Sequence, residues 1–492
     1  MVDFIILKSE VYTMKETPVI RIQRAKIRNF RNVVSGEIRF PCSFGKDVFA
    51  PKADVLGIYG QNGSGKTTFI DVLEILKGLL CGEKIDTELS DCISYGHDNA
   101  QLQFEFSIFN RLESGKICKR RLIYEAILSR DSIDETVKCI TFDESSKKNT
   151  RLKTIFECRH QDKDDVFSPR NKLEMLFGTR KNNKINDLTV FKMLCGKEHR
   201  SFIFSREFLS LLRVVSNKAD DDIEPLFEIS YYAKTSLFVI LNRNNGLISL
   251  DAAIPFNFRT ENAGGFFALP IDSPVTVSSQ LLDIADQVLN TINTVLCKMI
   301  PGVKLGIKKI GTELMNDGNV GTKIQMVRKL ECEDGEVHDL PLKYESEGIK
   351  KITSVLHLLI AVYNSPSITL AIDELDSGIY EYLLGELLRI MQDSGKGQLI
   401  FTSHNLYPLE TLHSESLIFT TTDENARYSR IKNVRATNNL RSMYLREIIL
   451  GSEDDVTLYE ETNTAEIAHA MRLVGRDIKQ LTVDDTEGGS NV

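Results

Sequence analysis

One nine-residue segment restricts the fold more than any other part of this 492-residue chain. Gly60, Gln61, Asn62, Gly63, Ser64, Gly65, Lys66 and Thr67 fit the pattern G-x-x-x-x-G-K-[ST], and Thr68 follows them. An apolar run over Val55–Tyr59 precedes the segment, and apolar residues recur at helical spacing from Phe69 to Leu80. The order of strand, glycine-rich loop and helix lets backbone N–H groups and a helix N-terminus bind phosphate. The sequence therefore predicts an α/β fold with a phosphate-binding loop.

The residue types in this loop, and in a second strand, indicate a nucleotide with Mg²⁺. Lys66 is expected to reach the β- and γ-phosphates, and the Thr67 hydroxyl to bind the metal. Ile368–Ile372 is an apolar strand that ends in Asp373 and Glu374. Asp373 can hold the metal, and Glu374 can act as the general base that polarises the attacking water.

Composition places the chain among ordinary globular proteins, with 42% hydrophobic and 26% charged residues. Its length predicts two to four domains at roughly 100–200 residues each. The longest apolar run is Val355–Tyr363, well short of the ~20 residues of a membrane-spanning helix, so we expect no membrane segment. The N-terminus lacks basic residues ahead of an apolar stretch, and the nine cysteines form no C-x-x-C pair. These features favour free thiols in a reducing cytoplasm over secretion.

Charge is distributed unevenly along the chain, whose net charge is −8. Residues 451–492 contain ten acidic and three basic residues, so the rest of the chain is nearly neutral and the tail is expected to be solvated. The negative net charge of the whole chain therefore does not exclude a local basic surface that binds nucleic acid. Two basic clusters could serve it: Lys147, Lys148, Arg151 and Lys153, and then Arg180, Lys181 and Lys184.

Hydrophobic patterning divides the chain into four parts. Residues 18–145 are expected to form a first lobe, with two strands over 19–40 and an antiparallel β-meander over 102–142. Residues 146–330 form a mostly helical insertion, with helices over 205–215 and 275–300. Residues 331–450 alternate helices and strands, which favours a mainly parallel sheet covered on both faces. Residues 451–492 are the acidic C-terminal tail.

Three more features surround Asp373 in sequence. Ser346-Glu347-Gly348 opens a helix over 348–363, so a hydroxyl and free N–H groups face outward from a helix N-terminus, which can bind an anion. Ser346 also suits a plain helix N-cap. Asp376 continues the strand end after Glu374, and His404 ends the strand that begins at Gln398.

Taken in order, these motifs resemble those of the ABC-type ATPase superfamily. Gly60–Thr67, Ser346–Gly348, Asp373-Glu374, Asp376 and His404 correspond to its Walker A, signature, Walker B, D-loop and H-loop elements. The segment Ile27–Asn32, and the separation of 307 positions from Lys66 to Asp373, resemble those of the SMC, RecF and OLD branch. The resemblance covers 18–145 and 341–435, and no Q-loop glutamine is placed; Gln101 and Gln103 lie on a meander strand. The signature reads Ser-Glu-Gly followed by Ile-Lys-Lys, which resembles AAA-type ATPases of bacterial antiphage defence, including the AriA-type ATPase subunits of PARIS systems.

The resemblance implies an ABC-type P-loop ATPase that binds ATP and Mg²⁺ between two copies of the chain. Ser346, Gly348 and Asp376 would contact ATP held by Gly60–Thr68 of the second copy, and Thr67 and Asp373 would hold the metal. Lys66, Glu374 and His404 would be the catalytic residues. Because one chain carries one set of motifs, the resemblance implies at least a homodimer, or a higher homo-oligomer.

The resemblance also implies a role in defence. OLD-family proteins carry a C-terminal TOPRIM nuclease, and the 58 residues after Val434 are too few for one. A slow, switch-like ATPase is then expected to act as a sensor and scaffold in abortive infection, which holds and releases a separate toxic effector, a TOPRIM-type nuclease. The alternative is an SMC- or RecF-like DNA-repair ATPase that binds duplex DNA through the two basic clusters. A transporter motor fits less well, because of the insertion and the signature sequence.

Overall fold

The computed structural model describes residues 18–472 of the chain apart from a set of gaps. The gaps are 42–48, 50, 86–87, 112–116, 144–147, 162–165, 179–182, 216–221, 243–252, 260–263, 272, 316–317, 332–336, 432–438, 451–457 and 459–464. Part of the first basic cluster, part of the second, and most of the acidic tail lie outside the described residues.

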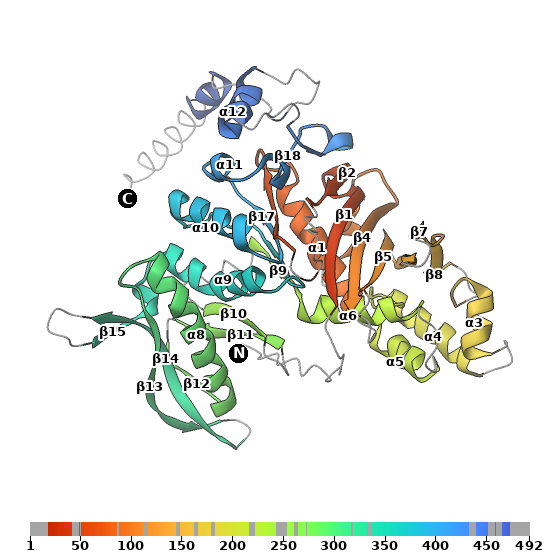
Figure 1. The fold of residues 1–492 in the computed structure, drawn as a ribbon, viewed down its shortest axis with the longest axis horizontal. Coiled ribbons are helices and arrows are strands. Elements are labelled where there is room, and N and C mark those ends of the chain that lie inside the picture. The colour runs from red at the N-terminus through yellow and green to blue at the C-terminus, as the bar shows by residue number, and fades with distance from the viewer. Residues whose placement is uncertain are drawn as a thin grey trace, which may run out of the picture.

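A six-stranded sheet forms the centre of the molecule (Figure 1). Its order is β19 (Tyr428–Ser429), β18 (Leu417–Thr420), β3 (Asp54–Tyr59), β17 (Gln398–Thr402), β16 (Thr369–Ile372) and β9 (Leu237–Ile240). All neighbours pair in parallel except β18 and β19. Leu56 and Ile58 enter one hydrophobic core, and Val55 and Tyr59 enter another on the opposite face. Burial on both faces explains why these strands read as continuous apolar runs.

The first face of the central sheet is covered by helices α1 (Lys66–Cys81) and α6 (Glu224–Thr235), which lie between it and an antiparallel sheet. That sheet has the order β2 (Val33–Arg39), β1 (Val19–Phe30), β4 (Asn99–Arg111), β5 (Ile117–Ser129), β6 (Ser132–Asp143) and β7 (Lys148–Asn149), and β8 (Lys153–Cys158) also pairs with β6. The predicted meander is thus confirmed. Short helices pack beside it: α2 (Leu89–Cys92), α3 (Arg170–Phe177), α4 (Asn183–Lys197) and α5 (Arg206–Val215).

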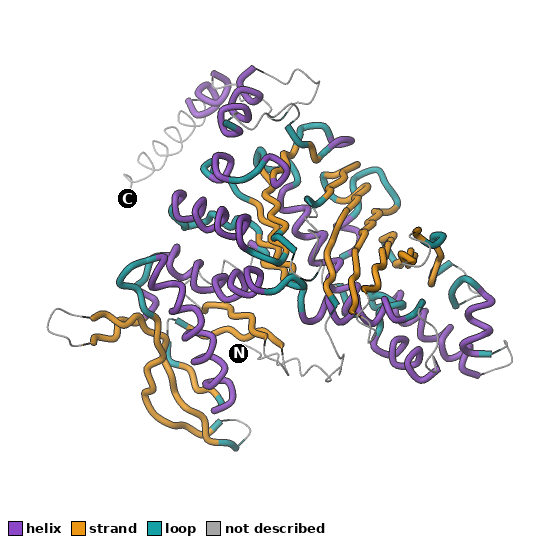
Figure 2. Tube along the Cα trace, viewed as in Figure 1, coloured by secondary structure: helices purple, strands orange, loops and turns teal. Residues whose placement is uncertain are grey.

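The second face is covered by α8 (Ser279–Met299), α9 (Glu347–Asn364) and α10 (Glu381–Ser394). Beyond α8 and α9 lie a hairpin of β10 (Ala253–Arg259) and β11 (Gly264–Pro270), and a sheet of β12 (Val275–Val277), β14 (Val320–Glu331), β13 (Leu305–Leu314) and β15 (Val337–Pro341). Figure 2 shows this sheet projecting at the lower left of the molecule. The remaining elements are α11 (Pro408–Thr411), α12 (Leu440–Leu450) and 3₁₀ turns at Leu342–Tyr344, Ser414–Ser416 and Glu424–Ala426.

Residues 146–330 contain α3–α6 and α8, but also strands that the hydrophobic pattern did not predict. The most important is β9, because it is the edge strand of the central sheet next to β16 and so belongs to the core. The helix expected from residue 275 begins instead at Ser279, since the Ser278 side chain caps it by accepting from the Leu281 N–H at 3.2 Å. The three residues before the cap pair with β14 as β12.

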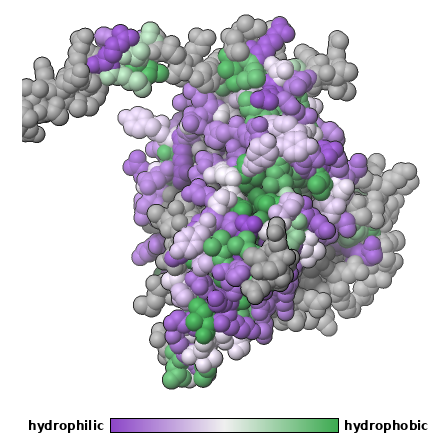
Figure 3. Space-filling view, turned by 90° about the vertical axis from the view of Figure 1, so that its left-hand side faces the viewer, coloured by the Kyte–Doolittle hydropathy of each residue, from purple (hydrophilic) through white to green (hydrophobic). Residues whose placement is uncertain are grey.

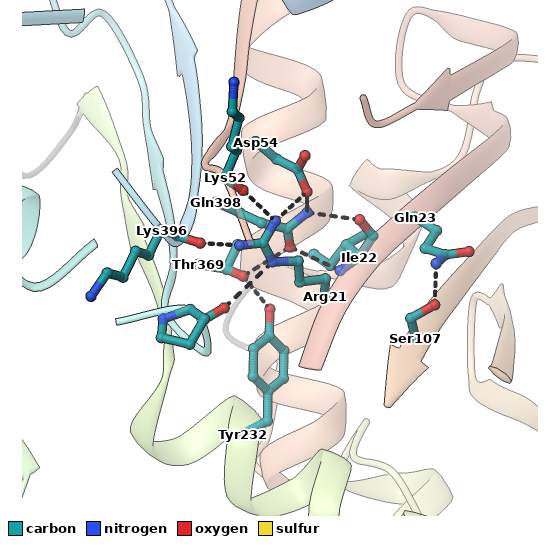
Figure 4. A network of polar contacts seen from close by, with 11 residues as sticks. Arg21, Ile22, Gln23, Lys52, Asp54, Ser107, Tyr232, Thr369, Lys396 and Gln398 are labelled. Atoms are coloured by element: carbon teal, nitrogen blue, oxygen red, sulfur yellow. Dashed lines mark hydrogen bonds and ion pairs between the residues drawn. The ribbon is translucent and has the colours of Figure 1, made fainter. Parts of the chain in front are cut away.

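A buried ion pair joins the antiparallel sheet to the central one (Figure 4). The Arg21 guanidinium on β1 lies 2.9 Å from the Asp54 carboxylate at the start of β3, and both side chains are fully buried. Arg21 also donates to backbone carbonyls of Lys52, Pro366 and Lys396. The Gln398 side chain bonds both backbone groups of Ile22, at 2.9 and 2.8 Å. These polar groups satisfy one another where no water can, as burial requires.

The polarity of the surface and the state of the cysteines are those of an ordinary globular protein. Figure 3 shows a mostly hydrophilic face whose broadest apolar area lies near its middle, with smaller apolar areas elsewhere on the same face. No described helix is both long and apolar enough to cross a membrane. The cysteines within the described part of the chain are free, as predicted, and Cys42 and Cys332 lie outside it.

Candidate functional site

The phosphate loop lies between β3 and α1, as its sequence predicts. Gly63 and Gly65 have φ of 77° and 102°, in the region that favours glycine. A methyl group at Gly60 would lie 1.8 Å from the Thr420 hydroxyl, so this position needs glycine for space as well. The Lys66 ammonium donates to the carbonyls of Gly60 and Gln61 at 2.8 and 2.9 Å. Burial lowers the pKa of this lysine, while Asp373 and Glu374 oppose the shift.

Three side chains that sequence reasoning did not assign brace the loop. Asn32, in the turn between β1 and β2, donates to the Gly63 carbonyl at 2.6 Å and accepts from the Thr68 hydroxyl at 2.8 Å. The Tyr428 hydroxyl donates to the Gly65 carbonyl at 2.9 Å, and the hydroxyls of Ser64 and Thr420 contact each other. Asn32 closes the Ile27–Asn32 motif, so for this residue the sequence did carry a signal.

The end of β16 brings Asp373 to the start of α1. The Thr67 hydroxyl donates to Asp373 Oδ1 at 3.2 Å, and the Thr402 hydroxyl donates to the same oxygen at 2.6 Å. The Asp373 side chain is fully buried. The two residues expected to hold the metal are therefore neighbours, although 306 positions separate them.

One oxygen of Asp373 is suited to a cation. Asp373 Oδ2 is buried and has no hydrogen-bond partner among the described residues. A buried carboxylate oxygen without a donor costs free energy unless a cation or water satisfies it. No group of three or more His, Cys, Asp or Glu that could hold a metal occurs in the described ranges. This donor set fits Mg²⁺, which takes one or two protein oxygens and completes its shell with phosphate and water.

Glu374 is held at both its backbone and its side chain. Its φ is 48°, an uncommon value for a residue with a side chain. The Glu374 N–H donates to the Thr402 hydroxyl at 2.7 Å, so one hydroxyl ties this residue to Asp373. The carboxylate oxygen Oε2 accepts from Asn242 Nδ2 at 2.8 Å. Neither residue carried a sequence signal, since each is a single polar residue outside any motif: Thr402 ends β17, and Asn242 follows β9.

The Asp376 side chain contacts the backbone of the segment that carries His404. Asp376 Oδ2 accepts from the N–H groups of His404 and Asn405, at 3.0 Å each. The Asp376 carboxylate thus holds the segment that carries His404, whose side chain is exposed. This places the histidine at the same edge of the sheet as Asp373, because β16 and β17 are adjacent and parallel.

The start of α9, with the residues predicted to form the signature, lies against Gly378 of the same chain but leaves Ser346 exposed. Ser346 is the N-cap of α9, and its hydroxyl accepts from the Ile349 N–H at 3.4 Å. Gly348 packs on the Gly378 carbonyl. One turn further, burial lowers the pKa of Lys351 to about 8, opposed by the charges of Asp373 and other nearby carboxylates. The hydrogen bonds of Ser346 to the described residues stay within its own helix.

A mainly parallel sheet, a glycine-rich loop at a helix N-terminus and a buried carboxylate beside the loop threonine are the features of a P-loop nucleotide-binding protein. The chain belongs to the family described as "AAA domain, putative AbiEii toxin, Type IV TA system", whose model matches residues 55–410. It is therefore an ATPase of a family associated with toxin–antitoxin and abortive-infection systems. No curated protein matches the sequence.

Solved structures similar to this chain include Smc head domains and the recombination mediator protein RecF. An Smc head domain with a coiled coil and joint from Pyrococcus yayanosii is 10% identical, with a TM-score of 0.40, and the match covers 88% of this chain and 99% of that one. The SMC head domain from Thermotoga maritima is 14% identical, with a TM-score of 0.34 and coverage of 84% and 99%. The recombination mediator RecF with ATP is 14% identical, with a TM-score of 0.32 and coverage of 78% and 94%.

Proposed function

We propose that this chain hydrolyses ATP at a site shared between two copies, with the phosphate loop of one copy facing the N-terminus of α9 from the other. The observation that carries the proposal is the exposure of Ser346 and Glu347 at that N-terminus. A helix N-terminus with free N–H groups stabilises anions. The loop of the same chain is braced by Asn32, Tyr428 and Thr420 without any contribution from Ser346.

Each residue of the site has a role in this proposal. Lys66 leaves its loop carbonyls to bind the β- and γ-phosphates, and the loop N–H groups orient them. Thr67 and Asp373 would hold Mg²⁺, which would supply positive charge beside the phosphates. Glu374 orients and deprotonates the attacking water, and His404 contacts the γ-phosphate. Ser346 and Gly348 of the second copy close the site, with Asp376 beside them.

The test of the shared site uses Ser346→Arg. An arginine at the helix start should block closure across the seam while the phosphate loop of the same chain still binds nucleotide, so ATPase activity is lost and ATP affinity is kept. Ser279→Arg, at the exposed first turn of α8, is the matched control and should retain activity. Full activity of Ser346→Arg would overturn the proposal.

A mixture of two inactive variants gives a second test of the shared site, because activity should then be recovered. Lys66→Ala destroys the phosphate loop, and Ser346→Arg destroys the signature. A mixed dimer has one site with both defects and one site with neither. Random pairing makes half of the dimers mixed, so activity should recover to about a quarter of wild type in a two-fold symmetric assembly. If each copy contained a complete site of its own, the mixture would stay without activity.

The proposed biological role is a sensor and scaffold in abortive infection that holds a separate nuclease effector and releases it when the ATP state changes. Support comes from the family, which is associated with toxin–antitoxin systems. Glu374→Gln keeps the shape of the side chain but removes the base, so ATP should remain bound and trap the closed assembly. We expect this variant to retain a co-expressed TOPRIM-type nuclease on purification with ATP, and Lys66→Ala to lose it. Retention that does not depend on ATP would contradict the switch.

DNA binding is the second proposed role, and its test is separate. Among the residues of the basic clusters whose side chains the structure describes, Lys153 lies 3.6 Å from Asp222, which offsets its charge. ATPase activity that rises with duplex DNA, and an affinity that falls steeply with salt, would favour the repair-type function. Activity indifferent to DNA would favour the effector switch.

A further inference from the structure

Asn242 contacts the proposed catalytic base from just beyond the end of a strand that carries no recognised motif. Its side-chain amide donates to Glu374 Oε2 at 2.8 Å. Asn242 lies two residues after β9, at an exposed position. The parallel register pairs Ile240 with Ile372, and the Asp373 N–H donates to the Ile240 carbonyl at 2.9 Å, so Asn242 and Glu374 stand level at the same edge of the sheet.

The order of the strands shows on which side of β16 this contact lies. β16 lies between β17 and β9, and β3, which leads into the phosphate loop, lies beyond β17. Asn242 therefore holds the Glu374 carboxylate from the side of β16 opposite to the loop. On the other side, Thr402 of β17 holds the Glu374 backbone, at 2.7 Å from its N–H. The backbone of Glu374 is therefore held from the side of the phosphate loop, while its carboxylate is held from the side of β9, the edge strand.

We propose that Asn242 is a positioning residue that restrains Glu374 in an orientation turned away from the bound phosphates, and thereby keeps ATP hydrolysis slow. The inference rests on the proposed function, in which Glu374 deprotonates water. Before that step the carboxylate has to exchange the amide donor for the water. The free energy of this exchange adds to the barrier, so the bond acts as a brake on turnover without any contact to the nucleotide.

The test compares steady-state ATPase rates of the full-length protein with Mg²⁺. Asn242→Ala removes the donor, and we expect kcat to rise about three- to tenfold, the factor that one net hydrogen bond is worth. KM should stay within about twofold, since Asn242 acts only through Glu374 in this proposal. Asn242→Asp has the same shape without a donor, and should also be faster. Asn364→Ala, an exposed asparagine at the end of α9, is the matched control and should match the wild type.

A double variant shows whether the effect passes through the base. Asn242→Ala combined with Glu374→Gln should be as slow as Glu374→Gln alone, whereas a loosened fold would change both backgrounds. A kcat that falls or stays unchanged in the folded Asn242→Ala and Asn242→Asp variants overturns the brake, while wild-type activity and its loss in Glu374→Gln leave the proposed function in place. If Glu374→Gln itself remains active, the proposed function fails instead, so the two failures are distinct.

Discussion

The backbones of Gly348 and Gly378 lie in direct contact. A methyl group at Gly348 would stand 2.0 Å from the Gly378 carbonyl oxygen, and one at Gly378 would stand 3.2 Å from the Gly348 nitrogen. Gly348 lies in the first turn of α9, and Gly378 follows Asp373 and Asp376 with a φ of 75°. The signature helix and the D-loop of one chain therefore cannot move independently, because no side chain separates them.

This contact predicts a strong effect of Gly348→Ala. The added methyl group meets backbone rather than a flexible side chain, so the D-loop or the start of α9 has to shift. Because 1 Å of misplacement in a catalytic site can cost about a hundredfold in rate, we expect kcat to fall by about that factor. ATP affinity, measured by fluorescence titration, should stay near wild type because the phosphate loop is on another element.

The matched control is Gly78→Ala in α1, where a methyl group meets nothing within 4 Å. Alanine is a better helix former than glycine, so this variant should gain about 0.5–1 kcal/mol of stability and keep its activity. Equal activity of Gly348→Ala and Gly78→Ala would show that the contact tolerates separation.

Thr402 predicts a second effect, since its hydroxyl connects Asp373 and Glu374. Thr402→Val has nearly the same shape but neither accepts from the Glu374 N–H nor donates to Asp373. Outer-shell partners of metal ligands typically contribute 10–100-fold, so we expect a loss of about that size in kcat or in Mg²⁺ affinity. A Mg²⁺ titration of the ATPase rate separates the two.

Thr291→Val on α8 is the control, because that exposed hydroxyl bonds only a carbonyl of its own helix among the described residues. It should leave rate and Mg²⁺ dependence unchanged. Wild-type kinetics in Thr402→Val would mean that the strand ends are positioned by the backbone alone.

The sequence predicted most of the parts of this site that are encoded by local patterns. The phosphate loop, with its preceding strand and following helix, forms where expected. So does the strand before Asp373, because a parallel strand that is buried on both faces requires a continuous apolar run. These patterns extend over consecutive residues, and therefore one sequence is sufficient to recognise them.

The missed parts depend on contacts between distant segments. Asn242 and Thr402 are single polar residues, and only the pairing of β9, β16 and β17 brings them to Glu374. The four residues of β9 are too few for periodicity to distinguish a strand from a helix. β13 was missed for another reason: seven of its residues from Lys308 to Leu314 are exposed, so no alternation of buried and exposed positions marks it.

The buried pair of Arg21 and Asp54 predicts a large loss of stability when one partner is removed (Figure 4). Arg21→Met leaves the Asp54 carboxylate buried without its cation, which typically costs 3–5 kcal/mol. We expect a clearly lower Tm in thermal unfolding. Replacing both partners, as in Arg21→Met with Asp54→Leu, should recover part of the loss, since no charge then remains buried.

The control for this pair is Arg389→Ala, which removes an exposed ion pair with Glu386 on α10. Exposed pairs contribute about 0–1 kcal/mol, so Tm should change little. A similar Tm for Arg21→Met and Arg389→Ala would contradict the role of the buried pair in joining the two sheets.

Glu37 on β2 predicts a pH-dependent contribution to stability. Its carboxylate lies 2.6 Å from the guanidinium groups of both Arg24 and Arg39. The hydrogen bond from Arg24, followed by that from Arg39, lowers the pKa of Glu37 from 4.5 to about 2. Because the pKa is lower in the folded state, the contribution is fully present above pH 4.5 and is lost as the pH falls toward 2.

Glu37→Gln should therefore lower Tm at pH 7, and the difference from wild type should shrink steadily between pH 4.5 and pH 3. The side chain is one-third exposed, so solvent screening limits the effect at pH 7 to about 1 kcal/mol or less. Glu424→Gln, an exposed glutamate in the turn Glu424–Ala426, is the matched control and should show a small difference that does not vary with pH. A constant difference for Glu37→Gln from pH 7 to pH 3 would show that the side chain stabilises the sheet through packing, because only a charge-dependent interaction disappears when the carboxylate is protonated.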